Sequence, residues 1–218
     1  MKHWWKFVAV LFVLYAIIAG FLMDVPALPI LHETIRNLYF HVTMWMAMMV
    51  LMTISLIYSI RHLSGFKNEH DIVASEAANT GLLFGFMGLV TGMIWARFTW
   101  GTWWVADPKL NGAAITILIY LAYVVLRNSI DEEQKRAKVS AVYNIFSYIM
   151  LLVFLLVLPR MTDSLHPGNG GNPAFSTYDL DNNMRMVFYP AVIGWTLLGV
   201  WMMTLKIRIK KIKLKKGL

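Results

Sequence analysis

Three tryptophans stand within five residues, at Trp100, Trp103 and Trp104, and Asp107 follows them closely. Indole rings offer flat apolar faces and N–H donors, which suit a large planar ligand with a polar edge. Tryptophans also gather at membrane interfaces, where one or two rings at a helix end are usual. The residues alone therefore leave open whether this segment is a ligand platform or an aromatic belt.

Two of the six histidines stand where chemistry is favoured. His41 lies at the outer end of a long apolar block, where a polar ring needs a partner, although a packed or capping histidine is the alternative. His166 begins a stretch rich in Gly, Asn and Pro, which predicts a loop. Imidazoles from two separate elements can bind opposite axial positions of haem iron, and neither histidine alone would favour that interpretation. The chain has no cysteine, which excludes thiolate ligands and disulfides.

The elements that position these residues must cross a membrane. The chain of 218 residues is 58% hydrophobic and only 15% charged, with a mean hydropathy of +0.58. A soluble domain carries about 25% charged residues. Blocks of spanning length predict an all-α bundle of six transmembrane helices in one domain, 1–218. The predicted spans are 5–23, 39–60, 74–97, 112–127, 140–158 and 185–205, with a tryptophan-rich outer loop over 98–111 and a basic cytoplasmic tail over 206–218.

The basic residues predict the orientation of the bundle. With the N-terminus inside, 15 of the 20 Lys and Arg residues fall on the cytoplasmic side. Both termini are then cytoplasmic, and the loops that hold the tryptophans and His166 are on the outer side. We expect the first span to stay uncleaved, because bulky residues occupy its end. The net charge of +8 does not indicate nucleic-acid binding, since seven basic residues lie in the last thirteen positions, directly after an apolar helix, where anionic lipid is the expected partner.

Two further features have ordinary structural interpretations. His3, His62 and His70 are expected to be solvated on the cytoplasmic side, and His32 to be a surface residue of the first outer loop. Small residues at three- and four-residue steps in the third span predict close helix packing. They are Gly81, Gly85, Gly88 and Gly92.

Together these segments resemble the CcmC/CcsA-type cytochrome c biogenesis proteins, the tryptophan-rich (WWD-domain) haem-handling family, and are most similar to its short six-span CcmC type. The family signature W-G-x-W-W-x-W-D-x-R-L-T is similar to residues 100–111 here. A Tyr-x-His-Val stretch ending at Val42 precedes it, and a Leu-His-x-Gly stretch ending at Gly168 follows it. The resemblance covers roughly residues 36–170.

The resemblance implies a set of site residues. It implies that His41 and His166 are axial haem ligands, and that Trp100, Trp103, Trp104 and Asp107 contact haem on the outer face. The chain departs from the signature at Ala106, where a third tryptophan is usual, and at Thr43, Lys109 and Asn111, which replace proline, arginine and threonine. Lys109 keeps the positive charge but lacks the bidentate fork of arginine for a carboxylate.

The resemblance also implies a function: haem, as haem b cargo, is bound at the outer face of the cell's inner membrane and passed to a haem chaperone for cytochrome c maturation. A non-enzymatic handling role is favoured over a cytochrome c haem lyase, because no large extracytoplasmic domain is present. A membrane subunit of an ABC-type haem exporter is a further alternative. The chain itself has no G-x-x-x-x-G-K-[ST] loop for ATP, but it could lie beside an ATPase. A haem-b electron carrier is disfavoured, since no other span contains a histidine pair.

Overall fold

The apolar blocks form six helical stretches long enough to cross a membrane, which confirms the predicted all-α fold for the part of the chain described here. A computed structural model describes residues 3–166 and 180–216. Its helices run α1 (Trp4–Leu22), the short 3-10 helix η1 (His32–Asn37), α2 (Leu38–Gly65), α3 (Asn68–Trp100), α4 (Pro108–Asn128), α5 (Glu133–Leu152), the π-helical turn η2 (Val153–Val157), α6 (Leu158–Met161) and α7 (Asn182–Lys215). The last three elements before residue 162 continue one another, so α5, η2 and α6 make one span.

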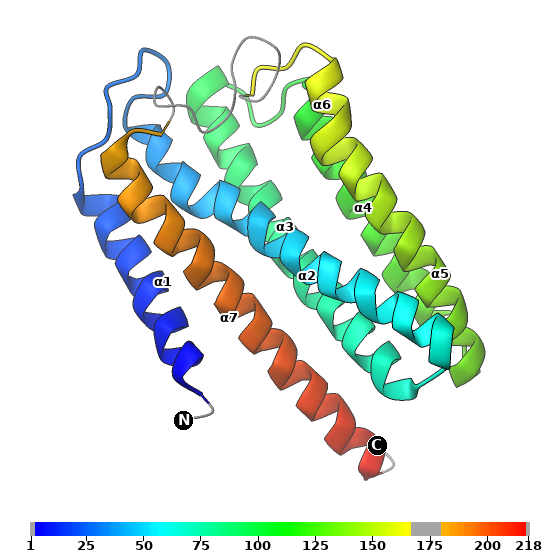
Figure 1. The fold of residues 1–218 in the computed structure, drawn as a ribbon. Coiled ribbons are helices and arrows are strands. Elements are labelled where there is room, and N and C mark those ends of the chain that lie inside the picture. The colour runs from blue at the N-terminus through cyan, green and yellow to red at the C-terminus, as the bar shows by residue number, and fades with distance from the viewer. Residues whose placement is uncertain (1–2, 167–179, 217–218) are drawn as a thin grey trace.

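Helix α2 runs through the middle of the bundle and packs against α3, α5 and α7 (Figure 1). The glycines of α3 permit its close approach. A Cβ atom added at Gly85 would lie 2.5 Å from the Met48 sulfur, and one at Gly88 would lie 2.9 Å from the Trp45 ring. These distances are shorter than van der Waals contact, so the predicted packing role of the glycine stripe is confirmed.

The helices extend beyond the predicted apolar blocks. Helix α3 continues to Trp100 and α4 begins at Pro108, so the tryptophan-rich loop spans 101–107 rather than 98–111. Helix α7 continues to Lys215, so most of the predicted basic tail is helical. The physical reason is the same in both cases. A helix can continue past the end of an apolar block, because its backbone hydrogen bonds do not depend on apolar side chains.

Buried polar side chains join helices inside the bundle. The Asn144 amide of α5 donates to the hydroxyls of Ser55 (2.7 Å) and Ser59 (2.8 Å) of α2. His62 was expected to be solvated, and that expectation is wrong: the side chain is buried, 3% exposed, with Nδ1 3.1 Å from the Lys67 carbonyl oxygen. The reason is local, because the left-handed residue Phe66 turns the chain back over the end of α2.

The two ends of the bundle differ in chemistry. Both termini lie at one end, and the tryptophan-rich loop, the start of α2 and α6 lie at the other (Figure 1). Asp107 and Pro108 fix the start of α4 at the latter end. The Asp107 carboxylate caps the helix by accepting from the Lys109 backbone N–H at 2.9 Å, and proline occupies the first turn, where it removes no helical hydrogen bond.

Candidate haem site between two histidines

A cavity of about 590 Å³ opens at the end of the bundle that carries the tryptophan-rich loop. It lies among the start of α2, the end of α3, the start of α4 and the η2–α6 segment. Most lining side chains are apolar, among them Leu38, Met46, Leu89, Leu110 and Leu155. Its size falls within the range of about 300–1,000 Å³ that is usual for small-molecule and cofactor sites.

His41 reaches this cavity from the first turn of α2. Its Nδ1 lies 2.9 Å from the carbonyl oxygen of Gly88 on α3. A carbonyl oxygen can only accept, so Nδ1 carries the hydrogen and Nε2 keeps a free lone pair. In histidines that bind metals, a hydrogen bond from the ring nitrogen that does not bind the metal fixes the tautomer and the ring orientation.

Neighbouring residues on α2 and α3 hold the His41 ring in place. Trp95 and Trp45 lie edge-on to it, with ring centroids 5.8 and 6.4 Å away. On another side stands Gly92, where an added Cβ would lie 2.6 Å from the His41 Cε1 atom. Only glycine leaves room for the imidazole there, which gives the end of the glycine stripe a role in the site as well as in packing.

His166 lines the same cavity from the loop after α6. Its Nδ1 lies 3.0 Å from Oδ1 of Asp107, and the Trp100 ring is edge-on to it at 5.2 Å. The ionised carboxylate accepts the Nδ1 hydrogen, so the lone pair of a neutral His166 imidazole is on Nε2. In both imidazoles Nδ1 thus contacts an acceptor and, within the described residues, Nε2 does not, although one ring is on a helix and the other on a loop.

Asp107 holds the His166 side of the site in place without lining the cavity. It is buried, with 2% of its surface exposed. Besides capping α4, it accepts from the Ser164 hydroxyl at 2.9 Å and from the Leu165 backbone N–H at 2.7 Å. Burial by itself would raise the pKa of this carboxyl group, but the hydrogen bonds from His166, Leu165 and Ser164 outweigh it and hold the pKa well below its usual value. Asp107 therefore stays ionised as the fixed anchor of the His166 loop.

The tryptophans divide between the cavity and the surface. Trp100 and Trp104 line the cavity, whereas Trp103 lies outside its lining and is 55% exposed. The Trp104 indole N–H donates to the Asn111 side-chain oxygen at 3.1 Å. The departure at Asn111 from the resembled signature thus supplies a partner that orients a cavity ring.

Two cations also line the cavity, Lys109 from α4 and Arg160 from α6. No local pattern in the sequence singles out Arg160, since it is far from the tryptophan-rich loop along the chain. Trp45 was missed as well, although its spacing of four residues from His41 places both on one face of α2. The structure therefore brings together four of the six predicted site residues, His41, His166, Trp100 and Trp104, with Asp107 directly behind them.

The fold and the cavity define a multi-pass membrane protein with two histidines in one apolar site. The chain belongs to the CcmC family, whose profile, described as "Heme exporter protein C", matches residues 1–217.

Relatives of that name are similar to much of the chain. One from Bradyrhizobium diazoefficiens is 33% identical over 77% of this chain and 63% of its own length. One from Paracoccus denitrificans is 29% identical over 62% of this chain and 56% of its own length. A third, from Rhodobacter capsulatus, is 28% identical over 80% of this chain and 72% of its own length. The matched part thus spans about three fifths of the first two relatives.

Proposed function

We propose that this chain holds haem in the cavity with His41 and His166 as opposite axial ligands, and delivers it for cytochrome c maturation. One observation carries the proposal: both imidazoles line a single apolar cavity, and each has Nδ1 bound to an acceptor, which leaves Nε2 for iron. As cargo, haem b would bring its own iron and porphyrin plane, and the chain would supply two nitrogens and the surrounding walls.

The remaining walls match the other parts of a haem molecule. Trp100 and Trp104 would offer indole surface to the porphyrin. Lys109 and Arg160 stand at the cavity wall and would meet the negatively charged propionates, where charge-assisted hydrogen bonds are strongest. Trp103 would stay outside this set, at the surface where a receiving haem chaperone would approach.

The two ligands differ in what supports them, which favours delivery over permanent binding. His41 is fixed by α2 and α3, whereas His166 depends on the Asp107 contacts of a loop. Loss of those contacts would free one axial position while the other ligand stays in place. The printed name of the relatives, "Heme exporter protein C", supports a haem-export role and favours handling over an enzymatic haem lyase. A place beside ABC-type subunits is part of the proposal.

We place the protein in the inner membrane of the cell. Delivery from the proposed site requires that the tryptophan-rich loop face the periplasm and that both termini lie in the cytoplasm. Fusion of a reporter that is active only outside the cytoplasm is expected to give activity after Gly171 and none after Leu218. The basic bias of the loops is the physical reason. Activity from the Leu218 fusion, or none from the Gly171 fusion, would contradict the orientation and with it periplasmic delivery.

Replacing Trp100 or Trp104 with alanine is expected to weaken haem binding about tenfold, because each change removes one ring from the cavity wall. Haem titration of the purified protein in detergent measures the affinity. Trp103→Ala is the matched control, since it removes the same ring from outside the lining and should leave the affinity unchanged. Equal losses in all three variants would mean that the loop acts as a whole at the membrane interface and not as a haem wall.

A further inference from the structure

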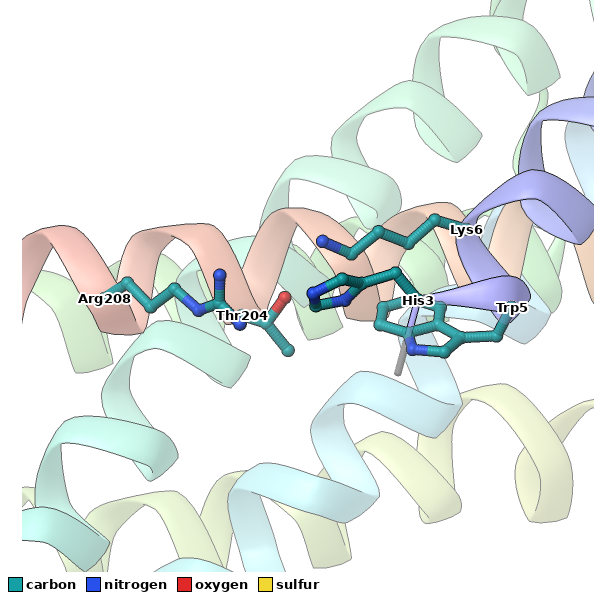
Figure 2. A pocket seen from close by; sticks show the side chains of 5 residues that line it. All are labelled: His3, Trp5, Lys6, Thr204 and Arg208. Atoms are coloured by element: carbon teal, nitrogen blue, oxygen red, sulfur yellow. The ribbon is translucent and has the colours of Figure 1, made fainter. Parts of the chain in front are cut away.

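A second hollow, of about 320 Å³, lies at the opposite end of the bundle, where α1 begins and α7 leaves the apolar core. It is lined by His3, Trp5 and Lys6 from the start of α1 and by Thr204 and Arg208 from α7. Figure 2 shows the nitrogens of Lys6, His3 and Arg208 directed toward one space beside the Thr204 hydroxyl. We call this the terminal hollow; it shares no lining residue with the haem cavity.

The terminal hollow has positive charge without a negative partner. Among the residues that the structure describes, no acidic side chain forms an ion pair with Lys6 or Arg208. The nearby Lys211 is different, because Glu69 of α3 neutralises it at 2.9 Å. The first turn of α1 holds no acidic residue and no side-chain cap, so the positive end of its dipole adds to the same field.

Aromatic rings hold one of the cations in place. The Lys6 ammonium lies 5.1 Å from the centroid of the Trp201 ring and 5.8 Å from that of Trp5. Such contacts orient the ammonium group but leave its hydrogen-bond donors available. Lys6, Arg208 and the His3 imidazole thus present donors from two helices that are far apart in the sequence, which is the donor set of a phosphate site.

The surface of α1 beside the hollow indicates where such a phosphate would come from. Phe7 and Leu11 follow His3 at four-residue steps, so the three side chains form one stripe along the helix. Phe7 is 78% exposed and Leu11 63% exposed, and both face the hydrocarbon when α1 spans a membrane. A ligand with a phosphate head and an acyl chain would fit the polar hollow and the apolar stripe at once.

We propose that the terminal hollow binds the phosphate group of an anionic membrane lipid through Lys6, Arg208 and His3. This site is separate from the haem cavity and independent of what that cavity binds. It would tie the ends of α1 and α7 together at the membrane surface, because its donors come from both helices.

The test uses the full-length protein in detergent and native mass spectrometry to measure lipid dissociation constants. The probes are phosphatidylglycerol, phosphatidylcholine and inorganic phosphate. Phosphatidylglycerol is expected to bind most tightly, and Arg208→Gln to weaken it about tenfold, the effect of one charge-assisted contact. Lys210→Gln is the matched control: it removes one charge from the same helix at an exposed position outside the hollow. It should change the affinity little. Lys6→Gln should repeat the effect of Arg208→Gln from α1.

Other results would overturn the proposal or change the source of the phosphate. Equal weakening by Arg208→Gln and Lys210→Gln, equal binding of phosphatidylcholine and phosphatidylglycerol, or no binding of any probe would overturn the proposal. Inorganic phosphate that binds as tightly as phosphatidylglycerol, with the same dependence on Arg208 and Lys6, would support the phosphate site and assign it to a soluble source. Thermal unfolding of each variant verifies folding, and Arg208 is exposed, so its replacement should leave the midpoint unchanged.

Discussion

Alanine at His41 or His166 is expected to abolish six-coordinate haem, whereas the unchanged protein, loaded with haem in detergent, should show a bis-histidine spectrum. Each variant keeps at most one protein nitrogen on the iron, so a five-coordinate or empty site should result. The loss of affinity should be at least about 100-fold, larger than the loss for a residue that only hydrogen-bonds a ligand. Absorption and resonance Raman spectra report the coordination, and haem titration reports the affinity.

Two comparisons separate ligation from general damage. His32→Ala is the matched control, because His32 is exposed and lies outside the cavity lining. It should leave the spectrum unchanged. Free imidazole should restore six-coordinate haem in His41→Ala and His166→Ala if the cavity remains folded. A protein without bis-histidine haem, or a His32 variant that loses haem while the His166 variant keeps it, would show that the ligand assignment is wrong.

Hydropathy was sufficient to predict six spans, because a bilayer excludes charge from long stretches of chain whatever the helices then contact. It could not predict where the helices end. Helix α3 continues to Trp100 and α7 to Lys215, since backbone hydrogen bonding carries a helix on into the polar interface. The His62 expectation failed for a related reason: the turn at Phe66 determines its burial, and hydropathy does not detect a left-handed turn.

The sequence was sufficient to select residues for the candidate site but not to predict how they are arranged. His41, His166 and the tryptophan-rich loop could be selected from residue type and family resemblance. The direction of each ring within a loop depends on the backbone, so only the structure could show that Trp104 lines the cavity and that the more exposed Trp103 does not. Arg160 reaches the cavity only because the span α5–η2–α6 brings it beside α4, and no local pattern along the chain reports that contact.

Asp107 is the clearest case of a residue whose position could not be predicted from the sequence. The sequence predicts that it contacts haem, because it follows the tryptophans and matches the signature. In the structure its carboxylate is buried outside the cavity lining and holds the first turn of α4 together with the segment 164–166. Two of the carboxylate contacts, from the backbone N–H groups of residues 109 and 110, are those of an N-cap, and the other three anchor the segment 164–166. One substitution can therefore separate the two roles.

Asp107→Asn is expected to weaken haem binding about 10- to 100-fold, the usual effect of disturbing a group that hydrogen-bonds a metal-binding histidine. Asparagine caps a helix about as well as aspartate, and its carbonyl oxygen can replace Oδ1 toward α4 and His166. The asparagine amino group would then take the place of Oδ2, which accepts a hydrogen bond from the Leu165 N–H. An amino group of this kind cannot accept that hydrogen bond. The loop should move, the negative charge behind His166 is gone, and a larger five-coordinate fraction should appear in the haem spectrum.

Asp181→Asn is the matched control for this change. Asp181 is the N-cap of α7 and accepts from the Met184 backbone N–H at 2.8 Å, without a role in the cavity lining. Both variants should unfold at nearly the same temperature as the unchanged protein, because asparagine preserves both caps. Only Asp107→Asn should alter haem affinity and coordination. If the two variants bind haem equally well, Asp107 acts as a helix cap alone, and His166 must be held in place by other contacts.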